Sequence, residues 1–281
     1  MDEPLTEDIV RHAYRLILGR APESDAVVQH ALRYGTVGRL RDAFLNSVEF
    51  ERILHTRPRL VQADAPPLPV ALQADDAEAA RMLAAVRMAW DAAPAQTEGG
   101  EQQAADLAGC LRRNGLALPA EAVAFELGCG AGRVSRHLAG MVGKLIAADA
   151  SPRQLAAARR AKPANVTLRV AEDLRFGMNE PFDLWYSWHA LQHSPPPLIA
   201  RALASAFVLL KPGGIAVFQL PTYAYGYSYP GPGDLHVLPQ RVVFSLAAEA
   251  GCVPLEVFDD LAVGPSALWR SSTFVLRKRT T

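Results

Sequence analysis

From Glu121 onward, short apolar runs alternate with segments of helical spacing, and this alternation limits the fold more than any other feature of the chain. Strands are predicted at residues 123–127, 144–148, 166–170, 182–187, 215–220, 253–258 and 273–278. Helices are predicted near residues 132–139, 152–161, 197–210 and 239–250. Strands that alternate with helices pair in parallel, and the helices then cover both faces of the sheet. We therefore expect an α/β fold with one seven-stranded sheet.

Residues 1–56 precede this pattern and have the spacing of short helices. Between Ile9 and Leu18, apolar residues recur three and four positions apart. Pro22 then ends this helix, because proline cannot continue a helix interior. A later helix is expected over residues 39–54, with inward-facing Leu40, Phe44, Val48 and Ile53. About fifty residues form a core that is only marginally stable by itself. We therefore expect a small all-α module that packs against the main domain or against a partner.

Residues 57–76 contain four prolines and no periodic pattern, which is the composition of a linker. Two alanine-rich helices are expected after it, at residues 77–92 and 101–114. The predicted organisation is therefore a helical module at 1–56, a linker at 57–76 and a main domain at 77–281.

The charge balance limits the classes of partner. Lys plus Arg and Asp plus Glu each number 29, so the formal net charge is zero. A nucleic-acid partner normally requires a basic surplus, and no stretch reaches the roughly 18 apolar residues that span a bilayer. The acidic amino end also lacks the apolar run of a secretory signal. We therefore expect a cytoplasmic protein with no nucleic-acid partner and no membrane span.

The side chains that bind metals show no diagnostic spacing. Cys110, Cys129 and Cys252 are scattered, which argues against a disulfide framework or a structural zinc site. Asp234 lies near His236, and Asp259 is followed by another aspartate, but neither arrangement matches a known ligand pattern. The sequence therefore predicts no metal.

A glycine-rich turn follows the first predicted strand. Glu126 leads into glycines at positions 128, 130 and 132. Glycine lets a ligand approach the backbone where a side chain would block it, and the next helix offers unpaired N–H groups. A dinucleotide fingerprint places its third glycine five positions after the first, where this chain has Arg133. The spacing therefore favours another nucleotide-like ligand, with an NAD site or a purely structural turn as alternatives.

The second predicted strand ends in an acid, Asp149, which lies 17 residues after Gly132. A carboxylate at this place can accept hydrogen bonds from both hydroxyls of a ribose, as it does in nicotinamide enzymes. Ser151 and Pro152 then match a helix N-cap and a first helical residue. An adenosine-containing ligand is therefore favoured, and the alternative is an ordinary acidic residue at a strand end.

Two further segments complete a pattern that resembles class I S-adenosylmethionine-dependent methyltransferases. Residues 182–193 are similar to the fourth strand of that family, and residues 209–218 to the turn into its fifth strand. The resemblance covers about residues 80–281 and implies a Rossmann-like fold with S-adenosylmethionine as cofactor. The residues it implies for the cofactor are Glu126, Gly128, Cys129, Gly130, Gly132, Arg133, Asp149, Ala150, Glu172, Asp173, Leu174 and Ser187. The family often has Gly-Asp after its third strand. In this chain, either Glu172 or Asp173 could take the place of that aspartate.

Shorter phrases indicate a pathway. LQHSPPP and VFQLPT resemble methyltransferases of bacterial saccharide and cell-surface polymer pathways, and LILGRAP and FLNSVEFERIL resemble a small helical repeat found beside bacterial glycosyltransferases. These resemblances imply O-methylation of a sugar, glycan or glycolipid acceptor in polysaccharide biosynthesis. Alternatively, residues 1–55 form the contact of a homodimer or dock onto another protein. The competing functions are a nicotinamide oxidoreductase, a natural-product methyltransferase for a small-molecule acceptor, and a non-catalytic scaffold of polysaccharide assembly.

Methyl transfer to a sugar hydroxyl requires a general base, because a protonated hydroxyl is a poor nucleophile. Histidine suits this task near neutral pH. We rank His193 and His236 above His189 as the base, and hydrogen-bonded packing is the alternative role for each. Residues 221–239 are interpreted as an aromatic lid over the acceptor, and a loop that packs locally or joins a dimer interface is the alternative. The predicted acceptor contacts are Trp188, Tyr223, Tyr225 and Tyr227.

The substitution Asp149→Ala tests the ribose assignment. It should weaken S-adenosylmethionine binding, because each lost charge-assisted hydrogen bond costs roughly 1.5–3 kcal/mol before water compensates. The dissociation constant measured by calorimetry should rise by about tenfold or more. An unchanged constant would mean that Asp149 does not contact the ribose.

Overall fold

The computed structural model describes residues 4–18, 21–50, 72–224, 227, 234–260 and 269–280. The chain divides into two compact units, Met1–Pro67 and Leu68–Thr281, and each is described by itself. Most of the predicted linker lies outside the described residues. In the described ranges, no helix combines the length and the apolar character needed to cross a membrane.

The first unit contains the predicted helices. They are α1 (Glu7–Ile17), α2 (Asp25–Ala31) and α3 (Val37–Leu45), with a 3-10 turn at Leu32–Tyr34. The side chains of Thr6 and Thr36 cap α1 and α3 by accepting hydrogen bonds from backbone N–H groups of the first turn. The core of the unit gathers Val10, Tyr14, Leu18, Val28, Ala31, Leu40 and Phe44.

The expectation of one continuous helix over residues 39–54 is wrong. α3 stops where the side chains of Asn46 and Ser47 each donate a hydrogen bond of 2.7 Å to a backbone carbonyl of the preceding turn. Such side-chain bonds to the backbone compete with continuation of the helix. As a result, Val48 is 64% exposed instead of facing inward, and Ile53 lies outside the described residues.

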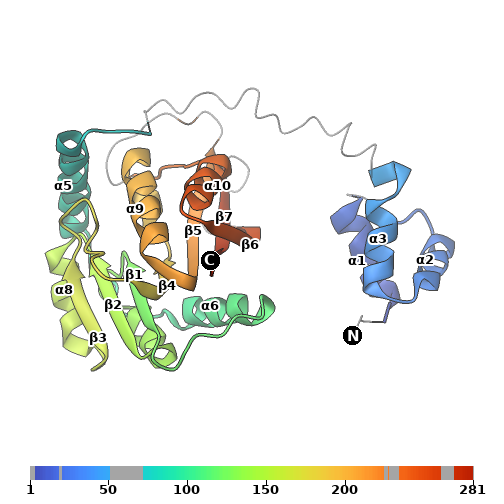
Figure 1. Ribbon diagram of the computed structural model, residues 1–281, viewed down its shortest axis with the longest axis horizontal. Coiled ribbons are helices and arrows are strands. Elements are labelled where there is room, and N and C mark those ends of the chain that lie inside the picture. Colours follow the sequence, from blue (N-terminus) through green and yellow to red (C-terminus); the bar gives the residue numbers. More distant parts are fainter. Residues whose placement is uncertain are drawn as a thin grey trace. The chain divides into compact units, whose positions relative to one another are not determined.

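The second unit is built on one seven-stranded sheet with the order β3-β2-β1-β4-β5-β7-β6 (Figure 1). The strands are β1 (Val123–Leu127), β2 (Lys144–Asp149), β3 (Val166–Val170), β4 (Phe182–Ser187), β5 (Leu210–Ala224), β6 (Cys252–Asp260) and β7 (Trp269–Lys278). β1 to β5 pair in parallel, and β7 lies antiparallel between β5 and β6. The predicted α/β fold is therefore confirmed, and β7 is the one strand of this sheet that runs opposite to the others.

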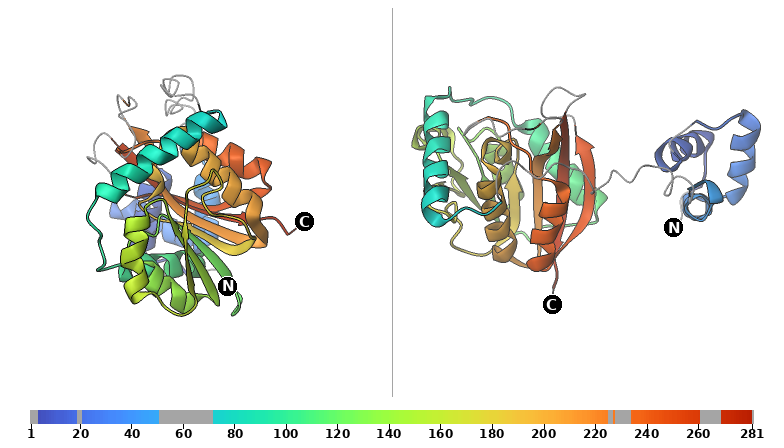
Figure 2. Two further views of the ribbon diagram at one scale, coloured as in Figure 1. Left: turned by 90° about the vertical axis from the view of Figure 1, so that its left-hand side faces the viewer. Right: turned by 90° about the horizontal axis from the view of Figure 1, so that it is seen from above.

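The helices lie on both faces of this sheet (Figure 2). One core contains residues of α5 (Asp76–Ala92), α9 (Pro196–Leu209) and α10 (Gln240–Glu249). The core on the other face contains residues of α6 (Glu101–Arg113), α7 (Ser135–Leu138) and α8 (Pro152–Ala158). Successive residues of a strand alternate between the two cores, so Phe125 belongs to the first and Ala124 to the second. α5 contacts both α8 and α9 and so connects the two faces across one end of the strands.

The order of the strands reverses direction between β1 and β4. β2 and β3 follow on one side of β1, whereas β4 and β5 follow on the other. In open α/β sheets, the loops on the two sides of such a reversal diverge and leave a crevice outside the carboxyl ends of the strands. The turn after β1 and the 3-10 turn η4 (Leu191–His193), which comes soon after β4, are therefore expected to border the site.

Candidate cofactor and acceptor site

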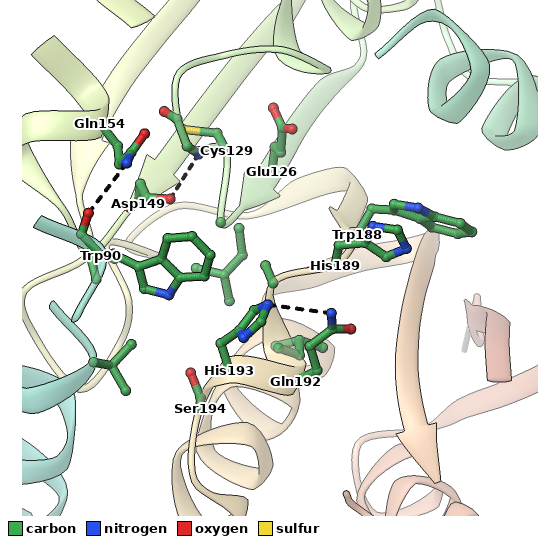
Figure 3. A pocket seen from close by; sticks show the side chains of 18 of the residues that line it. Trp90, Glu126, Cys129, Asp149, Gln154, Trp188, His189, Gln192, His193 and Ser194 are labelled. Atoms are coloured by element: carbon green, nitrogen blue, oxygen red, sulfur yellow. Dashed lines mark hydrogen bonds between the residues drawn. The ribbon is translucent and has the colours of Figure 1, made fainter. Parts of the chain in front are cut away.

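A cavity of about 400 Å³ opens at this reversal point (Figure 3). Its walls come from the turn after β1, the ends of β2 and β3, the segment after β4, and the helices α5 and α9. The predicted residues that line it are Glu126, Gly128, Cys129, Gly130, Arg133, Asp149, Ala150, Trp188, His189 and His193. The fold thus brings most of the predicted cofactor residues and two of the three predicted histidines into one space.

The glycine turn has the backbone shape that its sequence indicates. Gly128, Gly130 and Gly132 have φ values of 79°, 53° and 79°, in the left-handed region that favours glycine. A Cβ on Gly128 would lie 2.1 Å from the Cβ of Ala190, so the turn after β1 touches the segment after β4 directly. Gly132 does not line the cavity, and a Cβ there would lie 3.2 Å from Ala158 of α8. Gly132 therefore lies close to α8 and outside the cavity lining.

Glu126 is a buried acid in the wall of the cavity, with 3% of its surface exposed. Burial raises its pKa to about 7, and the charge of Asp149 acts in the same direction. A hydrogen bond from Ser135 Oγ and the charge of Arg133 oppose the shift. A carboxyl group with a pKa near 7 loses its proton readily when a cationic group of a ligand comes close, because the cation favours the ionised form.

Asp149 ends β2 with its carboxylate between two loops. One oxygen accepts from Gly130 N and the other from Ser151 N, both at 2.8 Å. Burial raises the pKa of Asp149, and these two hydrogen bonds counteract that shift. Asp149 therefore fixes the glycine turn and the start of α8, in addition to lining the cavity.

α5 closes one side of the cavity and is fastened to α8. Gln154, which is 3% exposed, donates from Nε2 to the carbonyls of Trp90 (3.3 Å) and Ala93 (3.2 Å). Ser151 Oγ donates to a carboxylate oxygen of Asp91 at 2.5 Å. Trp90 and Gln154 both line the cavity. Sequence reasoning missed both residues, because neither lies in a recognisable motif.

The segment after β4 contributes an aromatic and imidazole wall. The Trp188 ring stacks on Tyr186 with centroids 6.3 Å apart, and the His193 ring meets Trp90 edge-on at 4.9 Å. His189 has a φ of 53°, which is uncommon for a residue with a side chain. Its Nε2 is buried and has no hydrogen-bond partner among the described residues. Burial, followed by the charge of Arg133, lowers the pKa of His189, so the neutral form dominates near pH 7.

The ranking of His236 above His189 needs correction, because His236 is fully buried and does not line the cavity. Its Nδ1 lies 2.9 Å from the Tyr227 hydroxyl, and its backbone N–H donates to Gln192 O at 2.7 Å. His236 therefore supports the η4 turn from behind. Gln192, which sequence reasoning did not select, lines the cavity instead.

Other predicted contacts also lie away from the cavity lining. The Asp173 carboxylate accepts from two backbone N–H groups of its own turn, so Ala171 and Phe176 form the cavity wall in place of Glu172, Asp173 and Leu174. Ser187 is buried and donates to Leu127 O, which ties β4 to β1.

The predicted tyrosine lid is described only in part. Tyr223 is 47% exposed on β5 and does not line the cavity. Tyr227 bonds to His236, and Tyr225 lies outside the described residues. Among the described residues, no group of three His, Cys, Asp or Glu side chains is arranged to hold a metal ion.

Residues 124–214, from β1 into β5, match the sequence family described as a methyltransferase domain. An uncharacterized methyltransferase of Synechocystis is 36% identical over 92 residues, which are 32% of this chain and 43% of that protein. The ubiquinone biosynthesis O-methyltransferase of Cereibacter sphaeroides is 33% identical over 117 residues, which are 40% of this chain and 44% of that protein. The chain thus spans less than half the length of these curated relatives.

Two solved structures share the fold. The cyclase SpnF superposes with a TM-score of 0.53 at 15% identity, over 76% of this chain and 100% of that chain. Magnesium protoporphyrin IX methyltransferase of Synechocystis, solved with bound S-adenosylhomocysteine, superposes with a TM-score of 0.50 at 16% identity, over 63% of this chain and 82% of that chain. Residues 124–214 therefore match a methyltransferase domain, and they lie on the predicted Rossmann-like sheet.

The contact between Gly128 and Ala190 can be tested by a pair of substitutions. Gly128→Ala should abolish S-adenosylhomocysteine binding and lower the melting temperature, because its Cβ would overlap Ala190. Gly130→Ala should be milder, since it shares the positive φ but meets no atom within 4 Å in the protein. The double variant Gly128→Ala/Ala190→Gly should recover part of the stability. If both single variants behave alike in calorimetry and thermal unfolding, the contact does not shape the turn.

Proposed function

We propose that this protein binds S-adenosylmethionine in the cavity and transfers its methyl group to a hydroxyl of a small-molecule acceptor. The observation that carries the proposal is that the glycine turn, two acids and two histidines line one cavity. The matched methyltransferase domain and the relative named an O-methyltransferase support the same reaction.

The side chains of the cavity fit the groups of this cofactor. Glu126 offers a carboxylate to the ammonium of the methionine part, and Asp149 offers free lone pairs to the ribose hydroxyls. Ala150, Ala171 and Phe176 offer apolar surface to the adenine ring. The buried Glu126 is the strongest element of the fit, because the described residues give it no contacting cation of its own.

The cofactor supplies a methyl group activated by a positively charged sulfur. The protein would align the acceptor oxygen with the methyl carbon, and α5, which hydrogen bonds hold to α8, covers one side of the cavity. The bound cofactor would supply the methyl group and leave as a neutral thioether. An imidazole nitrogen would take the hydroxyl proton of the acceptor, which would become a methyl ether.

His189 is our first choice for this base. It lines the cavity, and its lowered pKa keeps it neutral near pH 7. Strained backbone at a cavity wall is also typical of functional residues. His193 is the second choice, and His236 acts as a positioning residue for the η4 turn.

The finer prediction of a sugar, glycan or glycolipid acceptor rests on the resemblance of the segments LQHSPPP, VFQLPT, LILGRAP and FLNSVEFERIL to proteins of saccharide pathways. Trp90 and Trp188 support it, because indole rings offer flat surfaces for the apolar faces of sugars. An acceptor of natural-product type fits the same aromatic wall and is the competing substrate class. We also propose that residues 1–55 act as a docking module in the assembly of surface polymers.

A transfer assay with methyl-labelled S-adenosylmethionine tests the function. The intact chain should label hydroxylated acceptors in a panel of sugars, glycolipids and phenols. His189→Asn, which keeps a residue that tolerates positive φ, should lower kcat by about a hundredfold or more and leave the S-adenosylhomocysteine dissociation constant within about twofold.

His236→Asn is the matched comparison in the same assay and should lower kcat less than His189→Asn does. Full activity of both His189→Asn and His193→Asn would exclude a histidine base. An intact chain that binds the cofactor but labels no acceptor would support a scaffold instead of an enzyme.

A further inference from the structure

A second cavity, of about 390 Å³, lies between α7, α8 and β3. The glycine turn and the loop at residues 97–98 complete its lining. Cavities of this size hold small ligands in other proteins, and the proposed methyl transfer makes no use of this one. We propose that the second cavity binds a small molecule that joins an anionic group, phosphate or carboxylate, to an apolar body, and that its occupancy weakens cofactor binding.

The charged side chains around the second cavity are mostly cations. Arg136 of α7, Arg160 of the 3-10 turn η3 (Arg159–Ala161) and Lys162 line it, and Glu98 is the one acid among its described lining residues. The whole chain has a formal net charge of zero, so this is a local excess of positive charge. No carboxylate of the described residues pairs with any of the three cations. Cations that are not neutralised, gathered around one cavity, favour an anionic ligand.

Two of the cations are held in place by neutral oxygen atoms. Lys162 Nζ donates to Val166 O at 2.9 Å. Arg136 Nη2 donates to the carbonyl oxygens of Thr97 and, at 3.2 Å, Gly99. Hydrogen bonds to carbonyl groups position these side chains without cancelling their charge. The site is therefore partly preorganised, which lowers the entropic cost of binding an anion.

The remaining wall of the second cavity is largely aliphatic. Its apolar lining residues are Ala131, Ala157, Ala158, Ala161, Pro163, Val166 and Leu168. Arg160, Ala161 and Lys162 are exposed, so the cavity is open to solvent on the side of η3. A ligand could enter there, place its anionic group beside the cations and remove an apolar body from water against the aliphatic wall.

The second cavity adjoins the proposed cofactor cavity at the glycine turn. Ala131 lines both cavities. Ser135 lines the second cavity, and its Oγ donates at 2.5 Å to the carboxylate of Glu126, which lines the first. A ligand in the second cavity would therefore lie one hydrogen bond away from the acid that we assign to the cofactor ammonium.

The charge of the ligand sets the direction of this effect, which rests on the proposed function. Burial and the charge of Asp149 already raise the pKa of Glu126. A further negative charge behind Ser135 would act in the same direction, so that less of Glu126 is ionised when the cofactor ammonium binds. Coupling between two binding sites is reciprocal, so the cofactor should weaken binding of the anion by the same factor.

Four probes test the site by direct binding to the intact chain. Calorimetry at pH 7 and constant ionic strength compares phenyl phosphate and benzoate with benzyl alcohol, which lacks the charge, and with inorganic phosphate, which lacks the apolar body. At least one of the two charged aromatic probes should bind with a Kd below about 1 mM. It should also bind about tenfold tighter or more than benzyl alcohol and inorganic phosphate, because only it meets both parts of the wall.

Exposed residues of the cavity wall provide variants with opposite expected effects. Arg160→Gln and Lys162→Gln should each weaken binding of the charged probe by about fivefold or more, whereas Glu98→Gln should strengthen it. Arg159→Gln is the matched control, because Arg159 is also exposed on η3 but does not line the cavity. It should leave the Kd within about twofold. Thermal unfolding shows that each variant is folded.

The link between the cavities is tested by S-adenosylhomocysteine binding at increasing concentrations of the charged probe. The Kd for S-adenosylhomocysteine should rise by about threefold or more and then level off. In Glu126→Gln, which has no carboxylate at this position, the rise should shrink to less than about twofold. A rise that continues without limit would mean that the probe competes inside the cofactor cavity, and it would overturn the proposal.

Two further results would overturn the anion site. One is equal affinity for the charged and the neutral aromatic probes. The other is an equal loss of affinity in Arg159→Gln and Arg160→Gln, which would show a diffuse attraction to the surface. An unchanged Kd for S-adenosylhomocysteine would overturn the link between the cavities. A chain that binds the charged probe but not S-adenosylhomocysteine would keep the anion site and would overturn both the link and the proposed methyl transfer.

Discussion

The carboxylate of Asp149 is the interaction on which the rest of the site depends. It joins the turn after β1, through Gly130 N, to the start of α8, through Ser151 N. Ser151 in turn bonds to Asp91 of α5. One side chain at the end of β2 thereby connects the floor of the cavity to the helix that closes it. A buried carboxylate that accepts two backbone hydrogen bonds fixes the backbone around the cavity before a ligand binds.

Glu126 is a second buried acid of the site, and its pKa lies close to neutral pH. Burial raises the pKa of both acids: it brings the pKa of Glu126 to about 7, whereas two backbone donors oppose the rise at Asp149. Glu126 is therefore a carboxyl group whose ionisation responds to a nearby cation.

The strand pattern, the glycine turn and Asp149 could be predicted from sequence, because each depends on local periodicity or on a short motif. The contribution of α5 could not. Trp90 and Gln154 meet only because α5 crosses the end of the sheet, and no local signal marks such a long-range contact. His236 was ranked too high because its place beside η4, behind the cavity, depends on a backbone bond to Gln192 that sequence spacing does not reveal.

The most direct test of the account is calorimetry of S-adenosylhomocysteine binding at pH 6 and pH 8, in two buffers of different ionisation enthalpy. With a pKa of about 7 in the free protein, Glu126 is mostly protonated at pH 6 and mostly ionised at pH 8. Binding of the ligand ammonium favours the carboxylate, so about one proton should be released at pH 6 and almost none at pH 8. The dissociation constant should be about tenfold weaker at pH 6, and Glu126→Gln should lose both effects. Equal affinity at the two pH values without proton release, or no binding heat at all, would contradict the account.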